Sequence, residues 1–213
     1  MFLQISITGF RPHILILIVT AGISIWAFQD RSVIGKFVMY PYEIFRRKEW
    51  YRIITHAFIH ADGMHLLFNM FTLFFFGGVV TTMFSYVSTV PHVHFFVMYF
   101  SAIVVASASD LVKNKDNLHY MSLGASGAVS AVVFASIFFD PWNLIYVFFI
   151  PCPGIIFGII YLWYSSYMSK QGRDNIAHDA HLYGSIFGFL YPLFVEPQLI
   201  KHFVDRLLHP QFF

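Results

Sequence analysis

The fold of this chain is decided by the stretch from Gly63 to Ser109, which reads GMHLLFNMFTLFFFGGVVTTMFSYVSTVPHVHFFVMYFSAIVVASAS. It contains no Asp, Glu, Lys or Arg, so 47 consecutive uncharged residues separate Asp62 from Asp110. A helix needs about 20 apolar residues to cross the hydrocarbon core of a bilayer. The stretch is therefore long enough for two membrane-spanning helices and a turn. Its continuous apolar runs favour helices over the alternating pattern of a β-barrel strand.

The rest of the chain has the same apolar character. Of its 213 residues, 58% are hydrophobic and 11% are charged, whereas a soluble domain is typically about 45–50% apolar and about 25% charged. This composition excludes a soluble enzyme and a disordered protein. The net charge of +2, with no basic run longer than Arg46-Arg47-Lys48, gives no reason to expect a nucleic-acid partner. The single cysteine, Cys152, excludes an internal disulfide and a Cys-based zinc site.

Charged residues divide the remaining chain into further apolar segments. We predict an all-α integral membrane protein, a single domain over residues 1–213, with six transmembrane helices over residues 12–29, 64–83, 93–111, 124–140, 144–166 and 177–195. The long connection over residues 30–63 mixes aromatic with charged side chains, which is typical of a segment in the membrane interface. The segment Pro151-Cys152-Pro153-Gly154 should interrupt the hydrogen bonds of the fifth helix. The interruption would either produce a static kink or let this helix move as a gate for substrate.

Polar residues cluster at the start of three predicted helices, and ionisable groups within a membrane are usually functional. The clusters contain His56, His60, His65 and Asn69; Gly124, Ala125, Ser126 and Gly127; and His178, Asp179 and His181. The second, fourth and sixth helices run in the same direction, so the three clusters should lie near the same membrane face. A serine, a histidine and hydrogen-bond donors would then meet in one pocket, as acyl transfer by a serine nucleophile requires.

Each cluster also has a structural interpretation. Glycines in membrane helices usually allow close helix packing. Taken alone, the segment from Gly124 to Gly127 fits this packing role better than the role of a nucleophile site. The functional alternative is that the glycines leave space for a substrate carbonyl beside Ser126, with free N–H groups at the helix N-terminus facing the oxyanion. His65 and Asn69 are four residues apart and share one helix face, which favours an oxyanion role over a simple interhelical hydrogen bond.

His181 precedes two glycines, Gly184 and Gly188, that would let the sixth helix approach the fourth and bring His181 to Ser126. His178, one turn earlier, is the competing base. Asp179 lies about 200° around the helix from His181, so we expect a serine–histidine dyad without a third acidic residue. Although the chain has 11 histidines, it has no HExxH motif, so we expect no metal and no other cofactor. For His56 and His60 we expect a structural role in packing the long loop onto the second helix.

These residues resemble the rhomboid family of intramembrane serine proteases. The resemblance extends from Trp50 to Gly188 and rests on Trp50-Tyr51-Arg52, His60-x4-His65-x3-Asn69, Gly124-Ala125-Ser126-Gly127 and Ala180-His181-x2-Gly184-x3-Gly188. It implies a minimal six-helix bacterial-type member without an appended soluble domain, which lies in the lipid bilayer and cleaves transmembrane protein substrates. Ser126 is then the nucleophile, His181 is the base in preference to His178, and Asn69, His65 and the Ser126 N–H form the oxyanion site. His60, His65, Asn69, Ser126 and His178 should line a polar cavity.

Two features depart from the family pattern. Many members carry an aromatic residue four positions after the nucleophile, beside the catalytic histidine, but this chain has Ser130 there. The family also places the N-terminus in the cytoplasm and the catalytic face outside, which implies a bacterial inner membrane. The loop charges oppose this orientation, since the N-terminal side would hold three Lys and Arg residues and the other side ten. We nevertheless follow the family orientation, because the first loop is expected to be a folded interfacial element.

Two other functions remain open from the residues alone. A non-catalytic relative would bind membrane helices without cutting them, but such proteins usually lack the nucleophile or the base. A small transporter or metal-handling protein would use the histidines instead.

Overall fold

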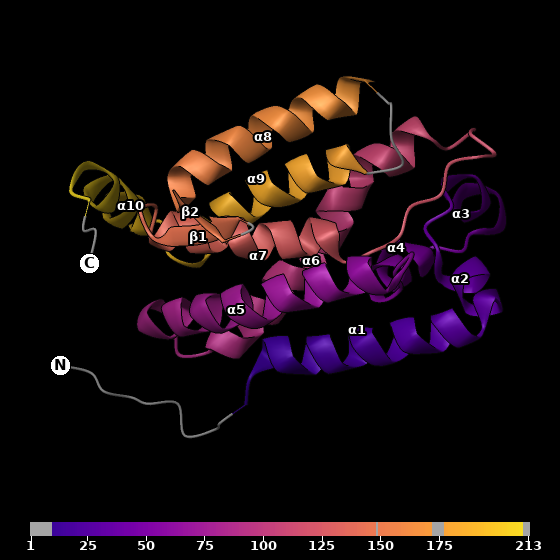
Figure 1. The fold of residues 1–213 in the computed structure, drawn as a ribbon, viewed down its shortest axis with the longest axis horizontal. Helices are drawn as coiled ribbons and strands as arrows, with labels where there is room; N and C mark the ends of the chain where they lie inside the picture. Colours follow the sequence, from indigo (N-terminus) through magenta and orange to yellow (C-terminus); the bar gives the residue numbers. More distant parts are fainter. Residues whose placement is uncertain (1–9, 148, 172–176, 211–213) are drawn as a thin grey trace.

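The computed structural model describes residues 10–147, 149–171 and 177–210. Figure 1 shows a mostly helical molecule in which the long helices lie side by side. The helices are α1 (Pro12–Gln29), α2 (Arg31–Phe37), α3 (Pro41–Arg47), α4 (Arg52–Thr55), the 3-10 helix η1 (His56–Phe58), α5 (Gly63–Val87), α6 (Pro91–Lys113), α7 (Ser126–Phe139), α8 (Gly154–Gln171), α9 (His178–Val195) and α10 (Leu199–Leu208). The strands are β1 (Leu144–Val147) and β2 (Ile150–Pro153).

Helix α7 is the centre of the bundle. Every residue from Gly127 to Phe139 is buried, and Figure 1 shows α7 between α1 and α5 on one side and α8 and α9 on the other. With 14 residues, α7 is only about 21 Å long at about 1.5 Å per residue, which is less than the about 30 Å of bilayer hydrocarbon. A helix of this length in a membrane places at least one of its ends below the surface.

Helix α9 packs directly against the backbone of α7. A Cβ atom added at Gly184 would lie 2.2 Å from the carbonyl oxygen of Gly127, and one added at Gly188 would lie 2.1 Å from that of Ala131. Side chains at either position would push the two helices apart. The predicted role of these two glycines in close helix packing is therefore confirmed.

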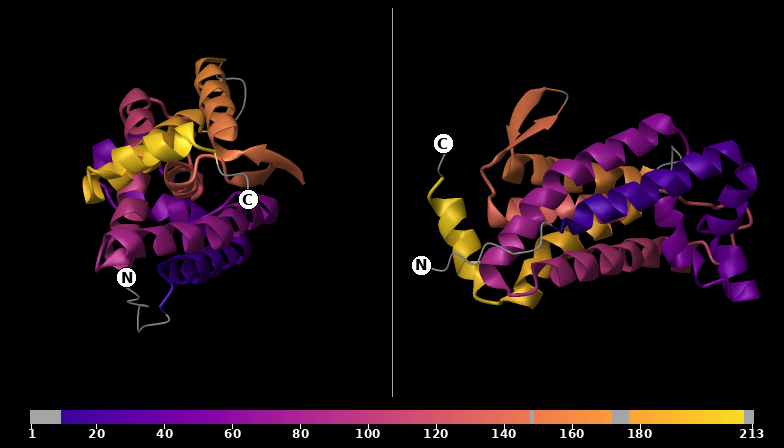
Figure 2. Two further views of the ribbon diagram at one scale, coloured as in Figure 1. Left: turned by 90° about the vertical axis from the view of Figure 1, so that its left-hand side faces the viewer. Right: turned by 90° about the horizontal axis from the view of Figure 1, so that it is seen from below.

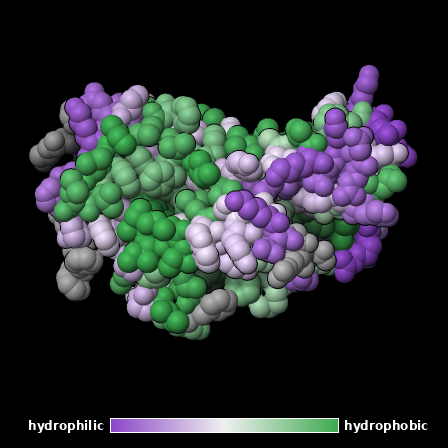
Figure 3. Space-filling view, turned by 90° about the horizontal axis from the view of Figure 1, so that it is seen from above, coloured by the Kyte–Doolittle hydropathy of each residue, from purple (hydrophilic) through white to green (hydrophobic). Residues whose placement is uncertain are grey.

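The protein has the surface of an integral membrane protein. Helices α1, α5 and α6 are each long and apolar enough to cross a bilayer, and α7 is apolar but shorter. Large apolar side chains remain exposed along the bundle, among them Ile18, Trp26, Leu67, Phe71, Phe75 and Trp163. In Figure 3 hydrophobic residues cover much of the left and middle of the visible face, while hydrophilic residues gather mainly at the right-hand end, with a smaller group at the upper left. Six transmembrane helices remain a prediction.

The main difference from the predicted fold lies between α7 and α8. Strands β1 and β2 pair in antiparallel fashion, with Leu144 opposite Pro153 and Val147 opposite Ile150, and the two strands project from the bundle in Figure 2. The prediction of a helix over residues 144–166 is therefore wrong before Gly154, and the fold is not purely α-helical. Pro151 and Pro153 belong to β2, so they neither kink nor interrupt α8, and the gate proposed from them loses its basis.

The long connection before α5 is folded into the short helices α2, α3, α4 and η1. Arg52 is buried at its centre and donates hydrogen bonds to Glu49 and to the carbonyl oxygens of Gly35 and Val38. Its guanidinium thus joins α2 to α4. After α9 the chain forms α10, which was not predicted, and which contacts α7 where His202 Nε2 lies 2.9 Å from the carbonyl oxygen of Phe139.

Candidate active site

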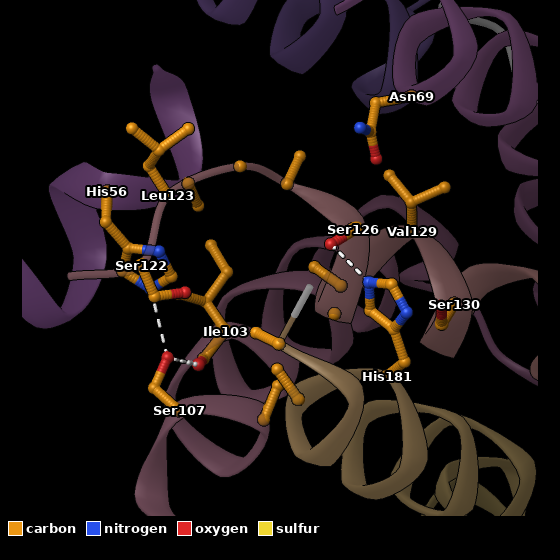
Figure 4. A pocket seen from close by; sticks show the side chains of 18 of the residues that line it. His56, Asn69, Ile103, Ser107, Ser122, Leu123, Ser126, Val129, Ser130 and His181 are labelled. Atoms are coloured by element: carbon orange, nitrogen blue, oxygen red, sulfur yellow. Dashed lines mark hydrogen bonds between the residues drawn. The ribbon is translucent and has the colours of Figure 1, made fainter. Parts of the chain in front are cut away.

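Ser126 and His181 meet at the start of two helices. Ser126 is the first residue of α7, and His181 lies in the first turn of α9. The His181 Nε2 and Ser126 Oγ atoms are 2.7 Å apart, a hydrogen bond that Figure 4 shows as a dashed line. Both residues line a cavity of about 940 Å³ between the helices. The backbones of α9 and α7 approach closely at Gly184, one turn after His181.

Asp179 and His178 lie away from this pair. The Asp179 carboxylate forms an ion pair with Lys113 and accepts hydrogen bonds from Ser109 and Ser169. These contacts link α9 to α6 and α8 and agree with the expectation that Asp179 does not orient His181. The His178 ring is buried, with its centroid 6.1 Å from that of His181. Because it does not line the cavity, the prediction that it would is wrong.

His65 and Asn69 line the same cavity from α5. The Asn69 side chain donates one hydrogen bond to the His65 carbonyl oxygen at 2.9 Å, and an amide NH₂ group carries a second hydrogen. Figure 4 shows Asn69 facing the region of Ser126. The first N–H groups of a helix have no acceptor within the helix. The Ser126 N–H is therefore a further donor at this end of the cavity, in addition to the Asn69 amide.

Gly124 and Gly127 have different roles around Ser126. Gly124 has a φ angle of +114°, which an L side chain rarely adopts, and an added Cβ atom would lie 2.6 Å from the His65 ring. The absence of a side chain at Gly124 therefore leaves space for the His65 ring. A Cβ atom at Gly127 would instead lie 2.7 Å from the Ala106 Cβ and 3.3 Å from the Ala180 carbonyl oxygen. Gly127 thus serves helix packing.

His60 contacts the residue directly before Ser126. It does not line the cavity, so the prediction that it would is wrong. His60 is fully buried, its Nε2 accepts a hydrogen bond from the Ala125 N–H at 3.4 Å, and its Nδ1 lies 2.9 Å from Ser24 Oγ. Burial, together with the neighbouring His65, lowers the pKa of His60 to about 3. The ring is therefore neutral at physiological pH and holds the residue before Ser126 against α1.

His56 connects the folded loop to α6. Its Nε2 lies 2.9 Å from Ser107 Oγ, its carbonyl oxygen accepts the Gly124 N–H, and burial lowers its pKa to about 4. We predicted that His56 and His60 pack the long loop onto the second helix. The His60 ring does contact α5, where its centroid lies 4.8 Å from that of His65, whereas the His56 side chain contacts α6 instead.

One residue beside the pair was missed by sequence reasoning. Tyr161 of α8 lines the cavity, and its ring centroid lies 6.2 Å from that of His181 with 25° between the planes. Nothing in the local sequence of α8 distinguishes Tyr161 from the other tyrosines of this helix. Among the residues that the structure describes, no group of three or more His, Cys, Asp or Glu side chains is placed to hold a metal ion.

The fold and site define an integral membrane protein with a serine–histidine pair in a cavity within its helical bundle. The family model described as "Rhomboid domain" matches residues 47–198. The chain belongs to the rhomboid family, as its motifs predict.

Three curated relatives show what the chain is similar to. It is 28% identical over 80% of its length to "RHOMBOID-like protein 12, mitochondrial" of Arabidopsis thaliana, covering 54% of that protein. It is 30% identical over 73% of its length to "Rhomboid protein 1, mitochondrial" of Saccharomyces cerevisiae, covering 44% of it. It is 27% identical over 67% of its length to "Putative rhomboid protease YdcA" of Bacillus subtilis, covering 65% of it. The chain thus spans about half of the mitochondrial relatives and somewhat less than two thirds of the bacterial one.

Proposed function

We propose that this protein is an intramembrane serine endopeptidase that cleaves transmembrane protein substrates. The observation that carries the proposal is the 2.7 Å contact between His181 Nε2 and Ser126 Oγ inside a cavity. A serine with a histidine in hydrogen-bond contact is the arrangement of an activated nucleophile. Rhomboid proteins are usually serine proteases of this kind, and the non-catalytic binder is the alternative function.

In the proposed reaction His181 accepts the Ser126 proton through Nε2 as Oγ attacks the scissile carbonyl carbon. The negative charge that develops on the carbonyl oxygen is stabilised by the Asn69 amide, the His65 ring and the Ser126 N–H. His181 then donates the proton to the leaving amine, and a water molecule hydrolyses the acyl-enzyme with His181 again as the base. The 940 Å³ cavity is where we expect this water to enter.

For the orientation we propose the family arrangement, with the N-terminus on the cytoplasmic side of a bacterial inner membrane and the catalytic end outside. The polar end of the molecule in Figure 3 supports the placement of the catalytic end at a membrane surface. Ser126 lies at the same end of the bundle as the short helices α2 to α4, because His56 and His60 contact the residues directly before it. The membrane itself is open to test, since two relatives are mitochondrial.

The test is cleavage of a single-span model substrate by purified protein in detergent. Wild type should cut, and Ser126→Ala and His181→Ala should not. Ser136→Ala is the matched control, because Ser136 lies on the same helix and its hydroxyl donates to the Val133 carbonyl oxygen within that helix. Folded wild-type protein that binds several substrates without cutting any would support the non-catalytic binder, and cutting by Ser126→Ala would exclude Ser126 as the nucleophile.

A further inference from the structure

The aromatic ring beside His181 comes from an unexpected helix. Position 130, where an aromatic residue was expected, holds a small hydroxyl side chain, and Figure 4 shows Ser130 close to His181. The ring that lies along the imidazole belongs to Tyr161 of α8, with 6.2 Å between centroids and 25° between planes. This distance lies within the about 4.5–7 Å at which aromatic rings attract one another.

A hydrogen bond to its hydroxyl and contacts with neighbouring aromatic rings both hold Tyr161 in place. Its hydroxyl lies 2.8 Å from Ser130 Oγ, a hydrogen bond between α8 and α7. Its sides contact Phe134 and Phe157, whose ring centroids lie 5.7 Å and 5.5 Å away. A larger side chain at position 130 would extend into the place of the Tyr161 hydroxyl, so Ser130 both leaves space for Tyr161 and binds it.

We infer that Tyr161 is a positioning residue that holds the His181 imidazole in hydrogen-bond contact with Ser126, and that Ser130 fixes Tyr161 through its hydroxyl. The inference rests on the proposed protease function. It assigns the orientation of His181 to contacts from two helices, α8 with Tyr161 and α7 with Ser130. Because α8 carries the ring and α9 carries the base, the orientation of His181 depends on α8 staying in place against α7. Tyr161 touches the base and not the reacting atoms, so its loss should weaken catalysis without removing it.

The first experiment compares substitutions at Tyr161 in the cleavage assay. Tyr161→Ala should lower kcat about three- to tenfold, the value expected for one aromatic contact, with KM changed less than twofold. Tyr161→Phe keeps the ring and should recover most of the loss. Tyr167→Ala is the matched control, because Tyr167 is an exposed tyrosine on the same helix that stacks on Trp163. A wild-type kcat in folded Tyr161→Ala, or an equal loss in Tyr167→Ala, would overturn the inference.

The second experiment tests the Ser130 contact by a double-mutant cycle. Ser130→Ala and Tyr161→Phe each remove the same hydrogen bond, so the double variant should be no slower than either single variant. Additive losses would show that the hydroxyls act separately and would refute the role assigned to Ser130.

A measurement that needs no cleavage separates this inference from the proposed function. The His181 imidazole lies beside the Tyr161 ring, so its carbon-bound protons should show a ring-current shift in NMR spectra of histidine-labelled protein, assigned with His181→Gln. Loss of that shift in Tyr161→Ala, but not in Tyr167→Ala, would support the stack even if no substrate were cut. An unchanged His181 signal in Tyr161→Ala would refute it.

Discussion

A methyl group added at Gly184 should separate Ser126 from His181, the proposed catalytic pair. The Cβ atom of Gly184→Ala would lie 2.2 Å from the Gly127 carbonyl oxygen, whereas ordinary contact begins at 3.4 Å. The difference of about 1.2 Å must come from movement of α9 away from α7, because the obstacle is backbone. His181 lies one turn before Gly184, so its distance of 2.7 Å from Ser126 would grow beyond a hydrogen bond.

Displacements of about 1 Å at a reacting group typically cost about 10²-fold in rate. We therefore expect Gly184→Ala to lower the cleavage rate by about two orders of magnitude and to cost about 1–3 kcal/mol of stability, the usual penalty of overpacking. Cleavage of the model substrate and the unfolding midpoint in detergent measure the two effects on one sample.

Gly22→Ala is the control, because a Cβ atom at Gly22 of α1 would meet nothing within 4 Å. It should keep the wild-type rate and an equal or higher midpoint, since alanine is the better helix former. A folded Gly184→Ala protein that cuts within threefold of the wild-type rate would show that glycine contact does not set the distance between Ser126 and His181.

Two further predictions concern the oxyanion site and the buried histidines. Asn69→Ala should lower kcat by about 10²–10³-fold and leave a measurable rate, and a complete loss equal to that of Ser126→Ala would contradict its oxyanion role. The lowered pKa values of His56 and His60, about 4 and about 3, mean that the unfolded chain binds protons below about pH 6.5 while the folded protein does not. Stability should therefore be complete at about pH 7.5 and fall by about 3 kcal/mol in total by pH 5.5. Denaturant titrations at both pH values measure this. His56→Gln should halve the loss, whereas His119→Gln, at an exposed position, should not.

The sequence was most informative where a pattern had one physical meaning. The apolar segment 12–29 corresponds to α1. The contact of Ser126 with His181 was predicted from the glycines around Ser126 and from Gly184 and Gly188 after His181. Residues 144–153 were predicted wrongly, because a short apolar run fits a hairpin as well as a membrane helix. Two prolines and the β-branched residues Ile145 and Val147 were the available signal for a strand.

Tyr161 could not have been found in the same way. Its place beside His181 depends on how α8 packs against α7 and α9, and α8 carries several aromatic residues with similar spacing. The absence of an aromatic residue at position 130 left open what packs against the imidazole, because that depends on contacts between residues far apart in the chain.

Under the proposed function, the contact of Gly184 and Gly188 with α7 also determines when the protein can become active during its synthesis. Ser126 and His181 are separated by 55 residues, so the ribosome makes the proposed nucleophile well before the proposed base. The backbone contacts that bring them together need Gly184 and Gly188 as well. A nascent chain that ends at α8 therefore has Ser126 without His181, and under the proposed function it could not cut neighbouring membrane proteins until α9 has been made.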